Sequence, residues 1–406
     1  MEILLFNCSW NNRGDESAIR AMIDEIKLIY PDAKFNILVH ATKFGLLQFP
    51  YSEKDVEITI VNNISKKQMI EIPILILSKG NFALSENLKT IIKCIKKADI
   101  ILHAPGGPSM GDLYPSMQYQ TFYKFFLAKA LKKPYGFYAP SMGPFNSKFQ
   151  NILRKSIFNG SSMTLTRESI SADYYNKLNC KKDIIVTADS ALQHIIDTKK
   201  YQQQFNEYPG LEEFFGKYKK IVGITITSLD WHSEYKNNTQ LQERIKSTFE
   251  KFIQYLNQKE YGVIFIPQLF GVQNDYDYMN EFVQENCFII DDEHDCYFQQ
   301  FLISKLYAVV GLRYHSNVFS AKMKTPFIPI SYEQKAVGFA KLARMEDYCI
   351  DINDLSFDKL TEKFSAIENN YDEIKKHLEN INQQLVEKSS QSTKLLKELI
   401  ESNKVV

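Results

Sequence analysis

Short apolar runs alternate with longer segments of helical periodicity along most of the chain, and this alternation constrains the fold more than any other feature. Helical segments such as Glu16–Ile29 and Phe122–Leu131 separate the runs. Strands that alternate with helices predict a mostly parallel sheet with helices on both faces. The runs of the first half are Ile3–Phe6, Phe35–Val39, Val56–Val61, Ile74–Leu77, Ile100–Leu102, Tyr135–Tyr138, Met163–Leu165 and Ile184–Val186.

The alternation stops once, over residues 197–219, which are polar and aromatic and lack a clean strand. It restarts with the runs Ile221–Ile226, Val263–Ile266, Phe288–Ile290, Tyr307–Val310, Phe327–Ile330 and Tyr348–Ile350. The 406 residues are also enough for two or three domains at about 100–200 residues per domain. The simplest account is an α/β protein of two doubly wound, Rossmann-like domains that face a cleft. The predicted parts are an N-terminal domain 1–196, a linker 197–219, a C-terminal domain 220–352 and C-terminal amphipathic helices 353–406.

The predicted helices of the tail carry an apolar stripe across four heptads, which Lys388–Ser392 interrupts. Two interpretations are open. The stripe packs along the body of its own chain, or it forms a coiled-coil seam between two copies and makes a homodimer. The stripe consists of residues spaced alternately three and four apart, namely Phe357, Leu360, Phe364, Ile367, Tyr371, Ile374, Leu378, Ile381 and Leu385.

Composition excludes several classes of function. Lys and Arg number 49 against 48 Asp and Glu, so no basic excess predicts a nucleic acid partner. The six cysteines form no C-x-x-C pair, which indicates reduced thiols and no metal site. No run approaches the ~18–20 apolar residues of a membrane span, and the first residues lack the features of a signal peptide. We therefore expect a cytoplasmic protein without a transmembrane segment, either free or peripheral to the inner face of the membrane.

The turns that follow the strands carry the candidate site residues, because ligands of an open parallel sheet bind beyond the carboxyl ends of its strands. After the first strand come Asn12, Asp15 and Glu16, where Asp15 is either the N-cap of a helix or a carboxylate that accepts a sugar hydroxyl or acts as a general base. The turn after Ile100–Leu102 holds three glycines within six positions, which indicates close approach to a ligand or to a neighbouring strand. The residues of interest there are Gly106, Gly107 and Asp112.

Cations follow other strands. Arg167 begins a helix, where it binds either an anion or one of the carboxylates Glu168 and Asp189. Gly311-Leu312-Arg313-Tyr314-His315-Ser316 ends a strand and opens a helix, which makes Arg313 and His315 the strongest predicted anion site. The alternative is a surface arginine and a core histidine. Lys335 adds a third cation after Phe327–Ile330, and Gln268 follows another strand, where it bonds either a ligand or its own loop.

Taken in order, these turns resemble the polysaccharide pyruvyl transferase family over roughly residues 1–351. An R-x-H block followed by a Y-x-x-K block is the most specific part of the pattern, while Pro108 replaces one of the family's usual glycines. The blocks are N-R-G-D-E-S-A-I, A-P-G-G-P-S-M-G-D, S-M-G-P, T-R-E-S-I-S, A-D-S-A-L, G-L-R-Y-H-S-N-V-F-S-A and I-S-Y-E-Q-K-A-V-G-F-A.

The resemblance implies a two-domain fold of the glycosyltransferase B type. It also implies transfer of a pyruvyl group from phosphoenolpyruvate onto two hydroxyls of a lipid- or nucleotide-linked sugar, which forms a cyclic ketal in the synthesis of a cell-surface polysaccharide. Phosphoenolpyruvate is then a co-substrate, and neither a cofactor nor a metal is expected. The expected catalytic residues are His315, Asp15 and Arg313; the donor-binding residues are Arg167, Arg313, Lys335 and Ser316; the acceptor-binding residues are Asn12, Glu16, Gly106, Gly107, Asp112 and Gln268.

Two other functions fit the same sequence. A nucleotide-sugar-dependent glycosyltransferase of this fold would use Arg313 and His315 to hold a diphosphate and Glu333 to hold a ribose. A non-catalytic scaffold would keep the fold alone, although the retained cations and Asp15 argue against it.

Overall fold

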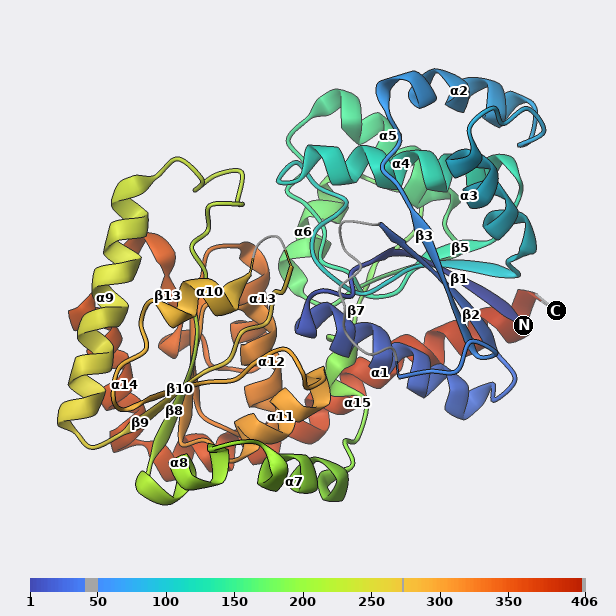
Figure 1. Ribbon diagram of the computed structural model, residues 1–406. Helices are drawn as coiled ribbons and strands as arrows, with labels where there is room; N and C mark the ends of the chain where they lie inside the picture. Colours follow the sequence, from blue (N-terminus) through green and yellow to red (C-terminus); the bar gives the residue numbers. More distant parts are fainter. Residues whose placement is uncertain (41–49, 272–273, 404–406) are drawn as a thin grey trace. The chain divides into compact units, whose positions relative to one another are not determined.

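The computed structural model describes residues 1–40, 50–271 and 274–403, which form two compact units (Figure 1). The first unit comprises Met1–Trp10, Ala18–His194 and Glu387–Val406, and the second comprises Asn11–Ser17 and Ile195–Val386. The main division therefore falls between residues 194 and 195. Helices α1 (Arg13–Ile29) and α15 (Tyr371–Asn403) each contribute to both units.

The first unit contains, in its described part, a seven-stranded parallel sheet of order β3-β2-β1-β4-β5-β6-β7. The chain builds outward from β1 to β3 and then crosses to β4 on the other side of β1, where Ile3 lies opposite both Phe35 and Ile100. This reversal of direction is the usual ligand position of a doubly wound sheet. The strands are β1 Glu2–Cys8, β2 Lys34–His40, β3 Val56–Val61, β4 Ile100–His103, β5 Tyr135–Phe137, β6 Met163–Thr166 and β7 Ile185–Val186.

Helices cover both faces of this sheet because alternate residues of its strands are apolar on each side. Ile3 and Leu5 of β1 pack with α1 and the end of α15, whereas Leu4 and Phe6 pack with the helices of the opposite face. Those helices are α2 Lys66–Leu77, α3 Glu86–Lys97, α4 Pro115–Ala130, α5 Lys148–Gly160 and α6 Ser169–Lys177, and a short 3-10 turn, η2, spans Ser190–Leu192.

The prediction of a strand over Ile74–Leu77 is wrong, because these residues end helix α2. Ser65 and Gln68 form a capping box, in which each side chain bonds the backbone of the other, and this motif starts the helix. Periodicity alone does not separate a short apolar run of a strand from one of a helix. Pro73, the residue before this run, also lies inside the helix.

The second unit has, among its described residues, a six-stranded parallel sheet of order β10-β9-β8-β11-β12-β13. Residues 197–219 hold two helices, α7 Thr198–Glu207 and α8 Leu211–Lys217. The strands are β8 Ile221–Thr225, β9 Gly262–Phe265, β10 Cys287–Ile289, β11 Ala308–Gly311, β12 Phe327–Ser331 and β13 Ile350–Asp351. The remaining helices before the tail are α9 Thr239–Gln258, α10 Asp275–Asn280, α11 Cys296–Ser304, α12 Tyr314–Met323 and α13 Gln334–Leu342, with 3-10 turns η3 Glu346–Tyr348 and η4 Ile352–Asp354.

The tail forms helix α14 (Phe357–Asn369) and the long helix α15. Its apolar stripe packs within its own chain, since Leu360, Phe364, Ile367, Ile374, Leu378, Ile381 and Leu385 are all buried. Helix α15 continues through Lys388–Ser392, where buried hydroxyls replace the apolar stripe: Ser389 donates to the Asp189 carbonyl at 2.6 Å, and Ser392 donates to Thr187 at 2.8 Å. A homodimer through this helix stays a prediction.

Candidate active site

The turn that opens α1 packs in the second unit, on the connection between β9 and α10. The Arg13 N–H donates to the Gln268 carbonyl at 2.8 Å, and Asn12 forms an antiparallel bridge with Leu269. Asn12 also caps the helix, because its side-chain oxygen accepts the N–H groups of Gly14 and Asp15. The alternative in which Asp15 is the N-cap is therefore wrong.

Glu16 is held by a residue that the sequence analysis did not select. Its carboxylate lies 2.9 Å from the Arg13 guanidinium, and both side chains are almost fully buried. Arg13 also donates to the Asp292 carbonyl at 2.6 Å. Asp15, by contrast, is only partly buried. Of the two predicted carboxylates, Glu16 is thus fixed in an ion pair, whereas Asp15 is accessible to a ligand.

His315 lies against this same turn. A Cβ atom placed on Gly14 would lie 1.9 Å from His315 Nδ1, so the absence of a side chain at Gly14 makes room for the imidazole. His315 is the second residue of α12 and only 6% exposed. The structure therefore brings the predicted acid/base residue next to the helix turn that carries the predicted acceptor carboxylates.

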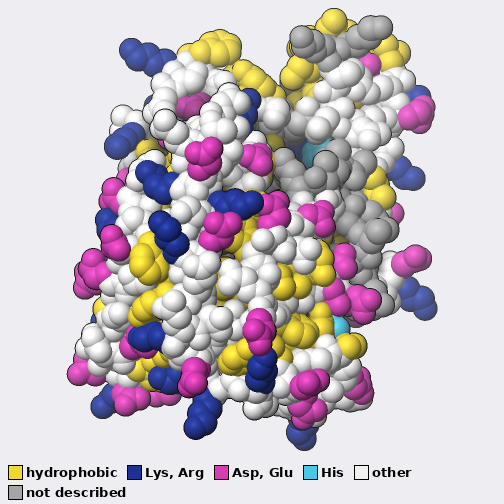
Figure 2. Space-filling model, turned by 60° about the vertical axis from the view of Figure 1, so that its left-hand side comes forward, with side chains coloured by type: hydrophobic (Ala, Val, Ile, Leu, Met, Phe, Trp, Pro, Cys, Tyr) yellow, Lys and Arg dark blue, Asp and Glu magenta, His cyan; other side chains and the backbone are white. Residues whose placement is uncertain are grey.

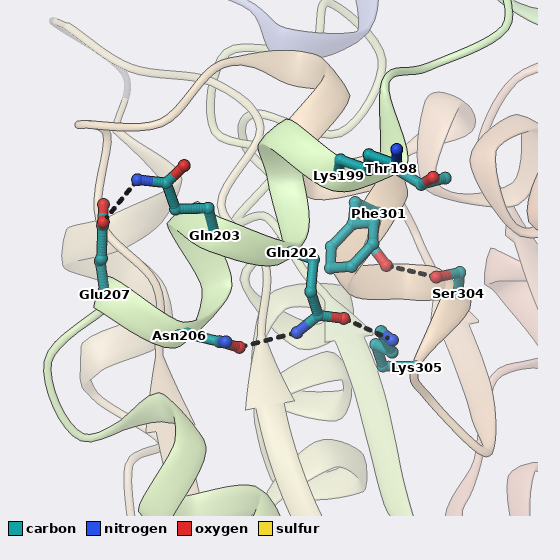
Figure 3. A pocket seen from close by; sticks show the side chains of 9 residues that line it. All are labelled: Thr198, Lys199, Gln202, Gln203, Asn206, Glu207, Phe301, Ser304 and Lys305. Carbon is teal, nitrogen blue, oxygen red and sulfur yellow. Dashed lines mark hydrogen bonds between the residues drawn. The ribbon is translucent and has the colours of Figure 1, made fainter.

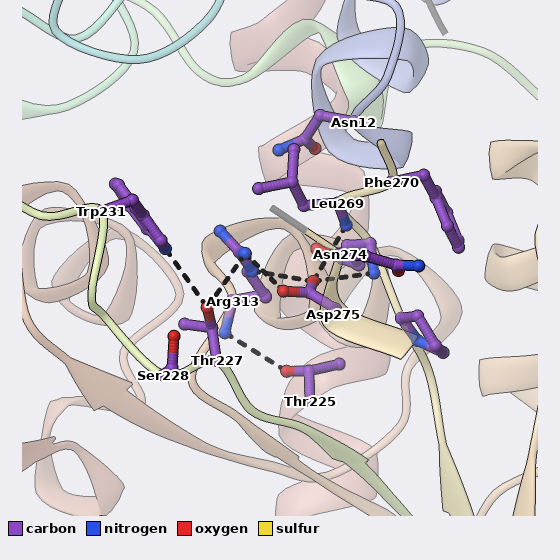
Figure 4. Close-up of polar contacts among 12 residues, drawn as sticks. Asn12, Thr225, Thr227, Ser228, Trp231, Leu269, Phe270, Asn274, Asp275 and Arg313 are labelled. Carbon is purple, nitrogen blue, oxygen red and sulfur yellow. Dashed lines mark hydrogen bonds and ion pairs between the residues drawn. The ribbon is translucent and has the colours of Figure 1, made fainter. Parts of the chain in front are cut away.

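Arg313 is the N-cap residue of α12 and forms a two-pronged ion pair with Asp275 (Figure 4). Nε lies 3.0 Å from Asp275 Oδ2, Nη2 lies 2.5 Å from Oδ1, and Nη2 also donates to Thr227 at 3.1 Å. Burial acts to lower the pKa of Arg313, but the charge of Asp275 and contacts with Tyr332 outweigh it and raise that pKa. Arg313 is therefore a fixed cation.

Asp275 organises the loop as well as the arginine. Its Oδ2 accepts the backbone N–H groups of Gln268 at 3.1 Å and Leu269 at 2.9 Å. The Gln268 side chain is 1% exposed, and its Nε2 has no hydrogen-bond partner within the described residues. A buried amide with an unmade bond costs free energy, so Gln268 is suited to bond a ligand. Asp275 was not among the predicted site residues. The signal in the sequence was an acidic residue in the segment that follows Pro267–Gln268.

A cavity of about 220 Å³ lies beside this ion pair. The indole of Trp231 packs over the Arg313 guanidinium, with 5.4 Å from Cζ to the ring centroid, and its N–H donates to Thr227 at 3.3 Å (Figure 4). The cavity is small and polar, and the described residues that line it include two carboxylates, Asp230 and Asp275, and no lysine or arginine. Its lining residues are Thr227, Ser228, Asp230, Trp231, Asn274, Asp275 and Tyr278.

Lys335 belongs to a second charged cluster that continues into a buried histidine. Its ammonium lies 2.7 Å from Glu333 Oε2, and Glu333 Oε1 lies 3.2 Å from His232 Nε2. The backbone N–H of Glu234 donates to His232 Nδ1 at 3.2 Å, so the other nitrogen, Nε2, carries the proton and donates to Glu333. His232 thereby orients the carboxylate that holds Lys335. Sequence reasoning missed His232, which lies 101 residues from Glu333.

Ser316 serves the backbone of its own helix. Its hydroxyl donates to the Arg313 carbonyl at 2.6 Å and lies 2.8 Å from the Thr225 hydroxyl. These bonds hold the start of α12 against the end of β8. They support the position of Arg313, which, like Ser316 itself, is one of the predicted donor-binding residues.

Arg167 belongs to the first unit. Its Nη1 lies 2.5 Å from Asp189, and its Nε donates to the Ser141 hydroxyl at 2.9 Å. Arg167 was predicted to bind either an anion or one of the carboxylates Glu168 and Asp189. In the structure it forms the ion pair with Asp189. Glu168 is the N-cap of α6, where burial raises the pKa of its carboxyl despite hydrogen bonds from Ser171.

The glycine-rich turn after β4 is also in the first unit. A Cβ on Gly111 would lie 2.3 Å from the Gly143 carbonyl oxygen, so this glycine permits close approach of a neighbouring turn, whereas a Cβ on Gly107 would meet nothing within 4 Å. Asp112 is bound by Arg154 and by the N–H of Ser147 at 3.2 Å. Of these residues, Gly107 has open space for a ligand beside it. Gly106 bonds through its carbonyl to the Ser141 N–H at 3.1 Å.

A larger cavity, about 820 Å³, lies between α7 and α11 and contains none of the predicted site residues (Figure 3). Its polar side chains bond one another: Gln202 to Asn206 at 2.7 Å, Gln203 to Glu207 at 2.8 Å, and Lys305 to Gln202 at 3.0 Å. Size alone therefore does not identify the site. Within residues 1–40, 50–271 and 274–403, no group of three or more His, Cys, Asp or Glu side chains is placed to hold a metal ion.

The chain is similar to known proteins in sequence and in fold. A sequence model described as polysaccharide pyruvyl transferase matches residues 12–334. The amylovoran biosynthesis protein AmsJ of Erwinia amylovora is 24% identical over 403 residues, which cover 93% of this chain and 94% of that protein.

Solved structures with a similar fold include an epimerase and a synthase. The UDP-GlcNAc 2-epimerase of Neisseria meningitidis, bound to UDP-GlcNAc, has a TM-score of 0.56 and 12% identity, with 99% of this chain and 100% of that chain covered. Sucrose-phosphate synthase from Thermosynechococcus elongatus has a TM-score of 0.57 and 10% identity, with the same coverage. At these identities the likeness concerns the fold, which is of the glycosyltransferase B type.

Proposed function

The chain belongs to the polysaccharide pyruvyl transferase family, and on this premise we propose that it moves a pyruvyl group from phosphoenolpyruvate onto two hydroxyls of a sugar. The product is a cyclic ketal, and inorganic phosphate is released. The observation that carries the proposal is the position of His315, which lies beside the first turn of α1 and two residues from the buried cation Arg313. An acid/base group, an anion-binding group and an accessible carboxylate, Asp15, thus belong to one unit.

Arg313 and Lys335 are the proposed donor-binding groups of this unit. Each is paired with a carboxylate, Arg313 with Asp275 and Lys335 with Glu333, and these pairs orient the cations. A guanidinium has five N–H donors, more than the three bonds to Asp275 and Thr227 use. The remaining N–H groups are suited to a carboxylate or phosphate oxygen of phosphoenolpyruvate. Arg167 of the first unit is proposed as a further contributor.

The reaction requires proton transfers, and we assign these to His315 and Asp15. Protonation of the methylene carbon of phosphoenolpyruvate makes its central carbon electrophilic, and the first sugar hydroxyl adds there. Phosphate then leaves, and the second hydroxyl closes the ketal. Of the two hydroxyl protons, one is retained in the new methyl group and the other leaves with phosphate. His315 is the proposed acid/base group, since an imidazole serves in both directions near neutral pH; Asp15 is the proposed base for the acceptor.

The residues proposed for acceptor binding belong to both units. Asn12, Glu16 and Gln268 lie in the second unit, and Gly106, Gly107 and Asp112 lie in the first. Glu16 and Asp112 are each held by an arginine, so they fix the first turn of α1 and the turn after β4 respectively. The proposed acceptor is a lipid- or nucleotide-linked sugar, and the proposed location is the cytoplasm. The scheme requires no cofactor or metal.

Phosphate release tests the proposal. The enzyme is incubated with phosphoenolpyruvate and candidate sugar acceptors, and in parallel with nucleotide-sugars. We expect phosphate release that depends on phosphoenolpyruvate and acceptor, and a loss of about a hundredfold or more in Arg313→Ala and His315→Ala. The matched control is Arg244→Ala, which removes an exposed guanidinium. Strict dependence on a nucleotide-sugar would establish the glycosyltransferase alternative, and turnover unchanged by both site variants would overturn the assignment of these residues.

A further inference from the structure

Helix α2 is apolar on the side that faces solvent. Its sequence, KKQMIEIPILIL, buries Leu75 completely, yet Ile70, Ile74 and Leu77 are 73%, 51% and 84% exposed. These three residues and the exposed Pro73 are spaced three and four apart, so they form one stripe along the helix. A helix that is apolar all round normally lies in a core or a membrane, and this one has solvent along the stripe.

The loop after α2 extends the stripe into a patch. Phe82 and Leu84 are 69% and 77% exposed. Glu71 of the helix accepts the backbone N–H groups of Leu84 at 3.2 Å and Ser85 at 3.3 Å, which holds the loop against α2. Figure 2 shows hydrophobic side chains, in yellow, exposed at the top of the view. The α2 patch consists of Met69, Ile70, Pro73, Ile74, Leu77, Phe82 and Leu84.

Lysines outnumber carboxylates in the segment that contains the patch. Residues 65–97 hold seven lysines and two glutamates, within a chain whose net charge is only +1. The two glutamates are engaged, Glu71 by the loop amides and Glu86 by Lys89 at 2.6 Å. Lys93 and Lys96 on α3 are exposed, and Lys96 lies 3.5 Å from the side chain of Asn81, the residue before Phe82. An exposed lysine, Lys96, thus lies beside the residue that precedes Phe82, and Lys93 is exposed on the same helix.

We propose that the α2 patch docks on an anionic lipid bilayer, with its aliphatic side chains and Phe82 inserted at the interface and the lysines among the headgroups. An apolar helix face bordered by lysines is the pattern of interfacial membrane binding. The cores of protein interfaces favour Tyr, Trp and Arg and are poor in Lys, but residues 65–97 contain no Tyr, Trp or Arg. The proposed function does not depend on this docking.

Binding to the bilayer is peripheral in this proposal. In the part of the chain that the structure describes, no helix combines the length and the apolar character that crossing a membrane requires.

Vesicle sedimentation of the full chain tests the proposal. The probe is vesicles of phosphatidylglycerol mixed with phosphatidylcholine, compared with phosphatidylcholine alone. We expect binding to the anionic vesicles that weakens with added salt, and a drop of about tenfold or more in the Ile74→Glu, Leu77→Glu double variant. The matched control is the Leu28→Glu, Ile195→Glu double variant, which places the same charges at side chains that are 74% and 87% exposed outside the patch.

A lysine variant tests the contribution of charge to vesicle binding. Lys93→Gln with Lys96→Gln should lower binding to the anionic vesicles and reduce its salt dependence. The proposal is overturned if the wild type does not sediment with anionic vesicles, or if the patch variant and the control bind equally. It is also overturned if analytical ultracentrifugation without lipid shows that the patch joins two copies of the chain. Phosphate release by the Ile74→Glu, Leu77→Glu variant with a water-soluble acceptor should equal that of the wild type, which keeps this test apart from that of the reaction.

Discussion

Gly14 lies directly against the imidazole of His315: a Cβ atom on Gly14 would be 1.9 Å from Nδ1 and 2.2 Å from Cγ of that ring. The two residues are 301 positions apart in the sequence, yet the absence of a side chain on Gly14 makes room for the ring of His315. This contact places the proposed acid/base group beside the helix turn that carries Asp15. The exact position of His315 should therefore depend on Gly14.

Replacement of Gly14 by alanine should displace His315 and lower kcat about a hundredfold, because a misplacement of about 1 Å costs on that order. Phosphate release at saturating phosphoenolpyruvate measures the effect. Gly216→Ala is the matched control, since a Cβ there meets nothing within 4 Å and the residue lies within helix α8. Full activity of Gly14→Ala would contradict the role given to this contact.

His232 should act on phosphoenolpyruvate binding through Glu333 and Lys335. His232→Ala removes the N–H that orients Glu333, and we expect KM for phosphoenolpyruvate to rise about tenfold while kcat changes less. His232→Gln supplies an N–H in nearly the same place and should restore most of the affinity. Steady-state kinetics of both variants measure this difference. If alanine and glutamine have the same effect, the histidine is only a packing residue.

Asp275 should stabilise the fold as well as orient Arg313. Asp275→Ala leaves a buried guanidinium without its partner and should lower the free energy of unfolding by about 3–5 kcal/mol. Urea denaturation followed by circular dichroism measures the change. Asp277→Ala, two residues along α10 and exposed, should leave it within about 0.5 kcal/mol. An unfolding free energy unchanged in Asp275→Ala would mean that water or another group compensates Arg313.

Asp112 predicts a pH dependence of stability. Burial alone would raise the pKa of its carboxyl, but Arg154 and the backbone N–H groups of Asn146 and Ser147 outweigh burial and lower that pKa below 3.8. The folded state therefore favours the ionised carboxylate. The stabilisation is present above the unfolded-state pKa, near pH ~4, and is lost as the pH falls through the lower folded-state pKa.

The substitution Asp112→Asn should remove this dependence and cost about 2 kcal/mol near neutral pH. Thermal unfolding from pH 7 downward measures it, and the curves of wild type and variant should converge below about pH 4. Asp173→Asn, on an exposed position of α6, serves as the control. A constant gap between wild type and Asp112→Asn at all pH values would contradict the assigned pKa shift.

Local sequence patterns determined most of the elements. Alternation of apolar runs with helical periodicity identified β1 to β12 near their observed bounds, because side-chain periodicity and turn residues act over a few neighbours. The predicted run Tyr348–Ile350 overlaps β13 only at Ile350. The predicted strand Ile74–Leu77 belongs instead to helix α2. Ile74 and Leu77 are exposed there and do not pack in the core of the chain. The same patterns selected Arg313, His315 and Lys335 at strand ends.

Only the tertiary structure decided which groups meet. Asp275 pairs with Arg313 across 38 positions and His232 with Glu333 across 101, and no local pattern encodes such pairs. The turn Asn11–Ser17 packs in the second unit although its strand β1 lies in the first. The physical reason is that parallel sheets bring their strand ends together through long crossovers, so the composition of a site depends on the strand order, while each strand depends on its own residues.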